Sequence, residues 1–243
     1  MKRVLLTISY DGTAYHGWQV QPHGITVQQT LQDALEKLLG KRVAVTGCSR
    51  TDAGVHAREF ACHLDCEDHF PKNAFLKGLN SLLPNDISVI DCKEVAQNFH
   101  ARYNAKGKKY IYNMYIGVQN PFYSRYMLHL DKMPDIDLMN KFCKGIIGTH
   151  DFAGFSSSKR TVEDTVRTIT HCQVTVKDNK IYFEIKGDGF LYNMVRILAG
   201  TALAVGQHRL KYDCYNDVFK CNDRTKAGDT LPAFALILDK VYF

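Results

Sequence analysis

Strand and helix patterns alternate in a fixed order from residue 4 to residue 95, and that order leaves few folds open to the chain. Short apolar stretches rich in β-branched residues predict strands over residues 4–10, 42–46, 59–66 and 87–95. Amphipathic helices are expected over residues 27–39 and 71–83, the first with Thr26 as its N-cap and Gly40 directly after it. The order β-α-β-β-α-β is that of a ferredoxin-like fold.

The rest of the chain looks like a variation on the same theme. We predict a strand over 110–117, a helix over 137–147, a hairpin over 169–187 with its turn at Asp178 and Asn179, a helix over 190–205 and a closing strand over 235–243. We therefore expect an α+β protein with two ferredoxin-like halves, residues 1–103 and 104–243, divided in the basic stretch FHARYNAKGKK. Together the halves would form an extended mixed sheet with a central cleft, where sites tend to lie.

The charge balance suits a polyanionic partner without proving one. The 243 residues contain 31 Lys and Arg against 25 Asp and Glu, a formal net charge of +6. No run reaches the roughly 18 apolar residues that a membrane span needs. Eight irregularly spaced cysteines fit buried thiols in a reducing compartment. We therefore expect a cytoplasmic protein that does not enter a membrane.

One cluster, CHLDCEDH from Cys62 to His69, raises the question of a zinc site. A strand would place Cys62 and Cys66 on one face and His63 on the other, and no second pair of ligands follows downstream. We therefore expect core thiols and no metal.

The predicted helix FLYNMVRILAGTALAVG is apolar on nearly all sides, which is typical of a buried helix. Arg196 lies in its middle. A buried guanidinium cannot shed its proton, so it would need a carboxylate or phosphate partner. On a half-exposed face it would instead extend its head to water, and the helix alone does not choose between these alternatives.

Asp52 stands alone in the turn of GCSRTDAGVHARE, between Arg50 and Arg58. An aspartate in a turn is most often a hydrogen-bond partner of the local backbone. Gly54, however, leaves room for a ligand to approach. Arg196 would need an acidic partner if it is buried, and Asp52 is an acid among cations. The two interpretations support each other, so we expect Asp52 to pair with Arg196. Such a pair would keep Asp52 ionised and suited to act as a nucleophile or base.

The segment FHARYNAKGKKYIYNMY interleaves cations with tyrosines, as expected where cations hold an RNA backbone and a ring stacks on a base. The alternative is a strand whose tyrosines pack inside and whose lysines are solvated, which we prefer for Tyr112. Alternation places Tyr110 and Tyr112 on the same face, so the spacing does not choose between them.

Four motifs in order make the chain resemble the tRNA pseudouridine synthase A family. They are YDGTAYHGWQVQP, SRTDAGVHA, FHARYNAKGKKYIY and DGFLYNMVRILAGTALAVG, and the similarity extends from Tyr10 to about Phe234. The resemblance implies an isomerase that converts uridine to pseudouridine in the tRNA anticodon stem-loop. It also implies that the enzyme uses no cofactor and forms a homodimer that grips tRNA across both subunits.

The resemblance further implies roles for single residues. Asp52 matches the catalytic aspartate and Arg196 its ion-pair partner, while Arg50 matches an arginine that helps to hold the base out of the stack. Tyr110 matches the tyrosine that contacts the target base. With Tyr110 we expect two further substrate-binding residues, Phe190 and Leu191. The residues expected to hold the RNA are Arg58, Arg102, Lys106, Lys108 and Lys109.

The chain departs from the family pattern at three places. Ser49 stands where a glycine is usual, Lys108 and Lys109 precede Tyr110 where the family has RxY, and Ala235 replaces a glycine near the C-terminus. The last departure affects the expected C-terminal wall of the pocket.

Three chemical routes fit these residues: attack of Asp52 on C1′, attack on the base, or removal of a sugar proton. Two other classes of protein compete with this interpretation. A non-catalytic RNA-binding module would show an aromatic string of the RGFGFVxF kind, which is absent here. A small-molecule lyase or isomerase would use Asp52 and Arg196 on an acidic metabolite and would not bind tRNA in a salt-sensitive way.

Overall fold

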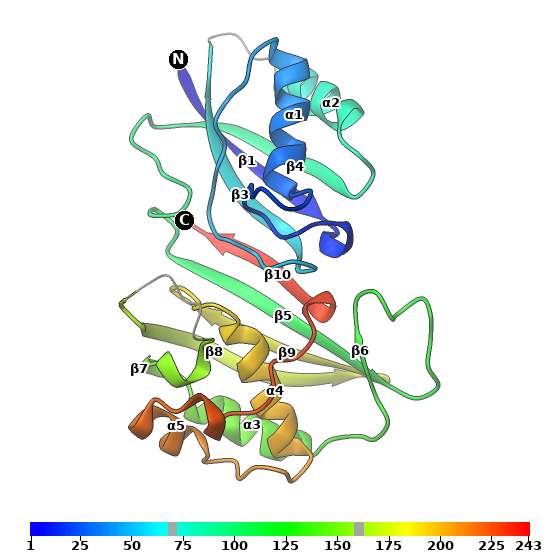
Figure 1. Cartoon of the computed structure of the whole chain (residues 1–243), viewed down its shortest axis with the longest axis vertical. Coiled ribbons are helices and arrows are strands. Elements are labelled where there is room, and N and C mark those ends of the chain that lie inside the picture. Colours follow the sequence, from blue (N-terminus) through cyan, green and yellow to red (C-terminus); the bar gives the residue numbers. More distant parts are fainter. Residues whose placement is uncertain (68–71, 158–162) are drawn as a thin grey trace. The chain divides into compact units, whose positions relative to one another are not determined.

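The computed structural model describes residues 1–67, 72–157 and 163–243, which group into two compact units. The first consists of Met1–Lys106 and Ile237–Phe243, and the second of Gly107–Leu236. Each unit combines helices with β-strands (Figure 1). The expected α+β class is therefore confirmed.

The sheet of the first unit is built around its first strand. Its strands are β1 (Lys2–Tyr10), β2 (Thr46–Gly47), β3 (His56–Cys66), β4 (Ile87–Val95) and β10 (Leu236–Tyr242). β1 lies between β3 and β4 and runs antiparallel to both. β2 is antiparallel to the later part of β3, whereas β10 runs parallel to the start of β3, with Ile237 opposite His56.

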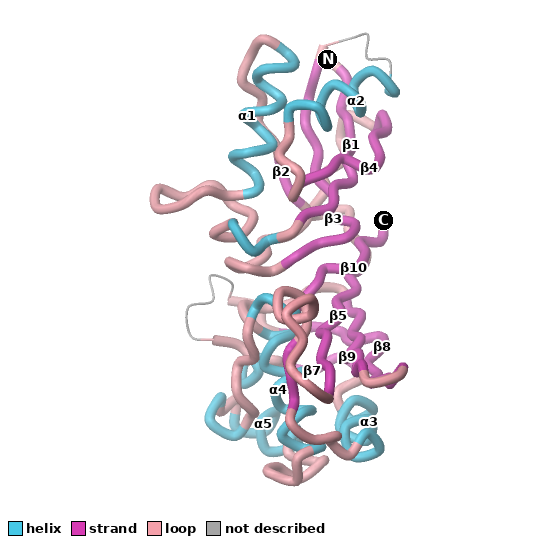
Figure 2. Tube along the Cα trace, turned by 90° about the vertical axis from the view of Figure 1, so that its right-hand side faces the viewer, coloured by secondary structure: helices cyan, strands magenta, loops and turns pink. Residues whose placement is uncertain are grey.

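Two helices accompany this sheet, α1 (Val27–Leu39) and α2 (Lys72–Leu82), and Figure 2 shows α1 alongside the strands. The ends of α1 are those that the sequence predicts: the Thr26 side chain accepts a hydrogen bond from the backbone of Gln29, and Gly40 ends the helix with a φ of 72°. The expected first residue of α2, Pro71, lies outside the described residues.

The strand predicted over residues 42–46 is wrong except for its last residue, because β2 begins only at Thr46. Val43 and Val45 are buried, as the alternating pattern suggested. Their carbonyl oxygens, however, accept hydrogen bonds from the side-chain amides of Gln32 and Gln28, at 3.0 and 2.8 Å. Helix side chains thus satisfy this backbone in place of a neighbouring strand.

The strands of the second unit are β5 (Gly107–Ile116), β6 (Leu128–Leu130), β7 (Gly148–Asp151), β8 (Val166–Lys177) and β9 (Lys180–Gly187). They run in the order β5-β9-β8-β7, with antiparallel neighbours, and β6 pairs with β5 in parallel. The predicted hairpin is β8-β9, and Asp178 at its turn has a φ of 55°.

The helices of the second unit are α3 (Ile136–Gly145), α4 (Met194–Gly206) and α5 (Tyr215–Cys221). Every residue of α4 except Arg196 is buried, which explains its apolar sequence. The helix begins at Met194 and not at Phe190 as predicted, because Asn193 before it adopts a left-handed conformation with a φ of 60°. Phe190 and Leu191 therefore lie in the turn that leads into α4.

Several short elements have no sequence prediction. They are β6, β7, α5 and the 3₁₀ helices η1 (Gly12–Ala14), η2 (Ala153–Phe155), η3 (Arg224–Lys226) and η4 (Ala233–Ala235). The closing strand, which we place with the second half from the sequence, is grouped with the first unit because it pairs with β3. Among the described residues, no helix combines the length and the apolar character required to cross a membrane.

Candidate active site

The turn that carries Asp52 links β2 to β3 and is tied to the end of β1. The hydroxyl of Tyr10, the last residue of β1, shares a buried hydrogen bond of 2.8 Å with the hydroxyl of Thr51. The backbone N–H of Trp18 donates to the carbonyl of Thr51 at 3.1 Å. The residue before Asp52 is therefore held through both its side chain and its backbone.

Two glycines bring the segment after β1 into direct contact with the same turn. A Cβ built on Gly12 would overlap the carbonyl oxygen of Val55, and one on Gly17 would lie 2.5 Å from the carbonyl oxygen of Thr51. Gly17 also has a φ of 82°, which side-chain-bearing residues rarely adopt. In the sequence these glycines served only to identify the YDGTAYHGWQVQP motif; the structure shows that they make room for the Asp52 turn.

The residues that follow the turn, at the start of β3, are also held in place. The backbone N–H of Gly12 donates to Nδ1 of the buried His56, the first residue of β3, at 3.0 Å. Two residues later, the exposed Arg58 forms an ion pair of 2.9 Å with Asp239 on β10. Arg58 thus lies at the surface, as an RNA-binding residue must, but a neighbouring carboxylate offsets part of its charge.

Asp52 itself is half-buried, whereas Arg50 is exposed. The carbonyl of Asp52 accepts the N–H of Val55 at 3.1 Å, which closes a tight turn, and Gly54 in that turn has a φ of 78°. The carboxylate therefore projects from a backbone fixed by several hydrogen bonds.

The tyrosines of β5 have separate surroundings in the second unit. The phenol of Tyr112 is fully buried and donates to the carbonyl of Pro232 at 2.9 Å, and burial raises its pKa well above the ordinary value. The ring of Tyr110 meets the edge of Phe190, with ring centroids 5.2 Å apart and planes at 83°. Tyr112 is thus a core residue. Tyr110 is also buried, at 6% exposed, and forms an aromatic pair with Phe190 close in the chain to the buried Leu191.

Arg196 is half-buried and has two anchors within its own unit. Its Nε donates to the carbonyl of Leu231 at 2.6 Å, and one terminal nitrogen donates to Oδ1 of Asn193 at 2.9 Å. Its positive charge also acts to lower the pKa of the nearby Tyr112 phenol, against the effect of burial. The side chain is held by the turn before α4 and by the segment around Leu231, which does not fit an arginine that simply extends to water.

The remaining predicted RNA-binding cations differ in their surroundings. Arg102 and Lys106 are exposed, whereas Lys108 and Lys109 are half-buried on β5. Lys109 forms an ion pair of 2.7 Å with Glu184 on β9. Of these four, Arg102 and Lys106 are the most accessible to a phosphate.

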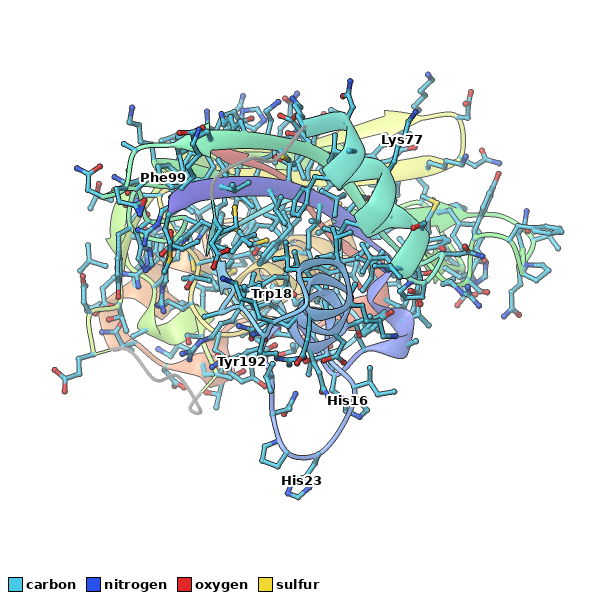
Figure 3. All side chains as sticks on the ribbon, turned by 90° about the horizontal axis from the view of Figure 1, so that it is seen from above. His16, Trp18, His23, Lys77, Phe99 and Tyr192 are labelled. Atoms are coloured by element: carbon cyan, nitrogen blue, oxygen red, sulfur yellow. The ribbon has the colours of Figure 1, made fainter. Side chains whose placement is uncertain are left out.

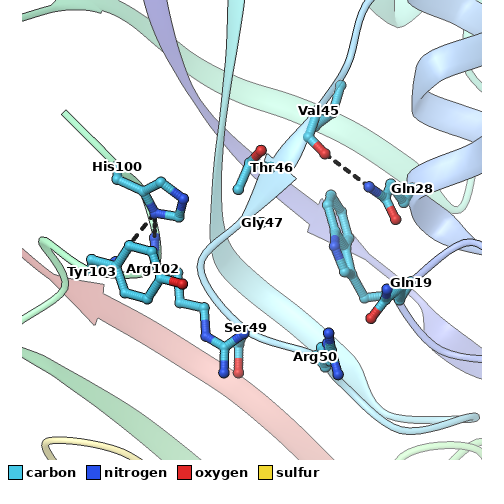
Figure 4. A pocket seen from close by; sticks show the side chains of 11 residues that line it. Gln19, Gln28, Val45, Thr46, Gly47, Ser49, Arg50, His100, Arg102 and Tyr103 are labelled. Carbon is cyan, nitrogen blue, oxygen red and sulfur yellow. Dashed lines mark hydrogen bonds between the residues drawn. The ribbon is translucent and has the colours of Figure 1, made fainter. Parts of the chain in front are cut away.

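A pocket of about 230 Å³ opens in the first unit next to the Asp52 turn (Figure 4). It is lined by Trp18, Gln19, Gln28, Val45, Thr46, Gly47, Ser49, Arg50, His100, Arg102 and Tyr103. Two predicted site residues, Arg50 and Arg102, thus share one pocket although they are far apart in the chain. Sequence reasoning did not identify the pocket, because its walls come from separate segments.

Two of the departures from the family pattern can be placed. Ser49 lines this pocket, and Ala235 is fully buried in η4. The expected pairing of Asp52 with Arg196 would join residues of two units, and it stays a prediction.

The cysteines of the CHLDCEDH cluster are buried thiols of β3, and the Nδ1 of His63 accepts the backbone N–H of Ala101 at 3.1 Å. His69 lies outside the described residues. Across the three described ranges, no group of three or more His, Cys, Asp or Glu side chains is placed to hold a metal ion.

A family model described as tRNA pseudouridine synthase matches residues 6–104 and 142–243. The chain is 44% identical over its whole length to the full tRNA pseudouridine synthase A of Clostridium kluyveri, and 45% identical over its whole length to that of Ruminiclostridium cellulolyticum.

Among solved structures, a chain of the archaeal box H/ACA sRNP Nop10-Cbf5 complex matches 82% of this chain at 11% identity, with a TM-score of 0.38. This chain spans 44% of that one, and so distant a likeness carries no further argument. The family model and the full-length relatives agree with the four sequence motifs, and we conclude that the chain belongs to the tRNA pseudouridine synthase family.

Proposed function

We propose that this protein isomerises uridine to pseudouridine in the anticodon stem-loop of tRNA, with Asp52 as the catalytic nucleophile and without a cofactor. Membership of the family supports tRNA uridine as the substrate. The sequence resemblance supports the anticodon arm, a homodimer and a cytoplasmic location.

The proposal rests mainly on the way in which neighbouring segments hold the backbone of the Asp52 turn in place. The hydrogen bonds to Thr51 and the close approach of Gly12 and Gly17 fix the backbone on which the carboxylate stands. Enzymes fix a reacting group in this way because positioning it lowers the entropy that must be lost on reaching the transition state.

The reaction detaches uracil from C1′ of the ribose, turns it, and rejoins it through C5, from which a proton leaves. To expose C1′, the nucleotide must leave its stack, which costs a few kcal/mol. Arg50, which is exposed next to the turn, would fill the vacated space, and Tyr110 would stack on the extruded base. Asp52 would then attack C1′ or the base, or remove a sugar proton, while Arg196 keeps the carboxylate charged.

The distribution of cations also supports an RNA substrate over an acidic metabolite. Arg50 and Arg102 are exposed in the first unit and share a pocket, and Lys106 is exposed nearby in the chain. A polyanion is held through several phosphate contacts, so exposed cations in separate segments suit an RNA strand.

Asp52→Asn tests the proposal, because it keeps the shape of the side chain and removes its charge. We expect tRNA affinity within about twofold of the original and no detectable tritium release from tRNA that carries [5-³H]uridine. Asp137→Asn makes the same chemical change at an exposed position in the first turn of α3, so it serves as the control and should retain turnover. Tritium release at the original rate by purified Asp52→Asn would overturn the nucleophile assignment.

A further inference from the structure

The pocket beside the Asp52 turn has the chemistry of a nucleotide-binding site. Arg50 and Arg102 lie at it, and none of its lining residues is acidic. Figure 4 shows His100, Arg102 and Tyr103 on one side of the pocket, with Gln28 on the other and Arg50 at the lower edge. The pocket thus combines positive charge with aromatic rings.

Tyr103 is unusually exposed for a tyrosine, at 77%, yet its ring is held in place. It stacks on the ring of His100, with centroids 4.2 Å apart and planes at 30°. One face of the tyrosine ring is therefore covered by the histidine, and the exposure of the residue leaves the other face accessible. A held aromatic ring with one free face is the arrangement on which nucleic acid bases stack.

The turn that carries this ring is rigid. Nδ1 of His100 accepts the backbone N–H groups of Arg102 and Tyr103, at 3.2 and 3.3 Å. The backbone N–H of His100 donates to Oδ1 of Asn104 at 2.6 Å, and the backbone N–H of Asn104 donates back to the carbonyl of His100 at 2.9 Å. The histidine therefore supports Tyr103 both by stacking and by hydrogen bonding, so little entropy is lost when a base binds.

The opposite wall is equally well fixed. Trp18 stacks on Phe60 of the core, with centroids 4.2 Å apart, and Gly47 lets the indole lie directly against β2. The side chain of Gln28 is held at both ends, by the N–H of Val20 and the carbonyl of Val45. The pocket is thus already formed before any ligand enters.

The two arginines supply the charge for a phosphate. Both are exposed, and within the described parts of the chain neither guanidinium has an acidic partner. Arg58 and Lys109, by contrast, are paired with Asp239 and Glu184. A phosphate at Arg102 would gain charge-assisted hydrogen bonds without displacing a protein carboxylate, and Arg50 adds positive charge at the edge of the pocket.

We infer that this pocket binds a second nucleotide of the RNA strand, close to the target uridine, with its base stacked on Tyr103 and its phosphate held by Arg102. Arg50 links the two positions, because it lines the pocket and lies two residues before Asp52. Two residues span at most about 7 Å of backbone, so the edge of the pocket lies close to the Asp52 turn. The inference rests on the proposed function, since it requires an RNA strand at Asp52.

A binding experiment on the stacking ring tests it. The probe is a substrate tRNA assembled from two pieces, in which the nucleotides flanking the target uridine are intact or, one at a time, abasic. The Asp52→Asn protein is used so that no turnover occurs, alone and combined with Tyr103→Ala or Tyr103→Phe. Because Tyr103 is largely exposed, both changes should leave the urea unfolding midpoint unchanged.

We expect Tyr103→Ala to weaken binding of intact tRNA at least about fivefold, the lower end of the loss of one base–aromatic stack. Tyr103→Phe keeps the ring and should bind within about twofold of Asp52→Asn alone. An abasic site at one flanking position should abolish the difference in affinity between the protein that retains Tyr103 and the Tyr103→Ala variant. Equal losses with intact and abasic tRNA at every flanking position, or no loss at all, would overturn the inference.

A second comparison addresses the phosphate. Arg102→Gln should reduce the slope of log Kd against log salt by about one, as expected for one lost phosphate contact. Lys77→Gln removes the same charge from an exposed site on α2 outside the pocket, where Figure 3 shows the side chain pointing outward. Equal slopes for the two variants would contradict the phosphate contact.

The binding experiments test the second nucleotide site separately from the role of Asp52. Tritium release by Asp52→Asn would overturn the role of Asp52 and leave the binding comparison valid. Loss of turnover in Asp52→Asn, with no effect of Tyr103→Ala on any tRNA, would overturn only the second nucleotide site.

Discussion

The hydroxyls of Tyr10 and Thr51 share a buried hydrogen bond of 2.8 Å between the last residue of β1 and the residue before Asp52. It connects an inner strand of the first unit to the turn on which catalysis is proposed. The position of Asp52 is therefore coupled to the sheet and not only to its own turn, and this coupling can be measured.

Thr51→Val should lower turnover more than it raises KM, because it keeps the shape of the side chain and removes the hydroxyl. The hydrogen bond is expected to contribute about 1 kcal/mol to the free energy of unfolding. A double-mutant cycle with Tyr10→Phe isolates that contribution by urea denaturation. Ser9→Ala, which removes the neighbouring bond to the carbonyl of Ala57, is the control and should leave turnover unchanged. A coupling of zero in the cycle would contradict the prediction.

Gly17→Ala should reduce both stability and turnover. The added methyl would lie 2.5 Å from the carbonyl of Thr51 at a φ of 82°, so the Asp52 turn must move, at a cost of about 1–3 kcal/mol. Gly40→Ala offers a matched control, because Gly40 has a φ of 72° with no atom within 4 Å of the new methyl. That variant should lose stability through backbone strain alone and keep its turnover per folded molecule. Equal effects of both variants on turnover would show that the contact with Thr51 is unimportant.

Arg196→Met should move the acidic limb of the pH–rate profile to higher pH. The predicted pair with Arg196 would favour the ionised form of Asp52, so the loss of that cation would make Asp52 harder to deprotonate. Arg196→Lys keeps the charge but loses the planar guanidinium that binds Leu231 and Asn193. The acidic limb of its pH–rate profile should therefore move less, while its maximal rate should still fall. An unchanged limb in Arg196→Met would show that the two residues do not interact.

Alkaline conditions should destabilise the protein through its buried thiols. Burial is the main cause that raises the pKa of Cys62 well above its ordinary value. On raising the pH, the unfolded chain therefore loses this proton first, near the ordinary pKa of about 8.5, and stability present below that pH is progressively lost above it. The urea midpoint should thus fall once the pH passes that value. The fall should be smaller in Cys62→Ala, whereas replacement of the exposed Cys221 by Ala should leave it unchanged.

The elements that the sequence predicted correctly are those fixed by local signals. The helix α1 has Thr26 and Gly40 at its ends, where each makes the expected cap. Similarly, β4 was predicted over residues 87–95, which are its observed bounds. Such ends depend on residues within a few positions of each other, so the chain itself carries the information.

The failures depend on partners that lie far away in the sequence. Residues 42–45 alternate as a strand would, but the side-chain amides of Gln28 and Gln32 donate to the carbonyls of Val45 and Val43. The pairing of β10 with β3 brings together residues that no local pattern connects.

The candidate site shows the same division. Asp52 stands out as an isolated carboxylate among cations, which is a local feature, but its catalytic role was inferred only together with Arg196 and the family motif, and it stays a prediction. The support from Tyr10, Gly12 and Gly17 was not identified, since it depends on how the segment after β1 packs, although the two glycines were a usable signal of close packing. The pocket around Tyr103 was missed because its walls meet only in the folded chain.

The pairing of Ile237 and Leu238 with the start of β3 sets an order of events during synthesis. The ribosome adds these residues after the whole of the second unit, at roughly 5–20 residues per second in general. For several seconds, the edge of β3 next to the Asp52 turn is therefore made but has no β10 beside it. A nascent chain can fold most of the first unit early, yet the strand that flanks the proposed catalytic turn is completed only when translation reaches the codons for β10.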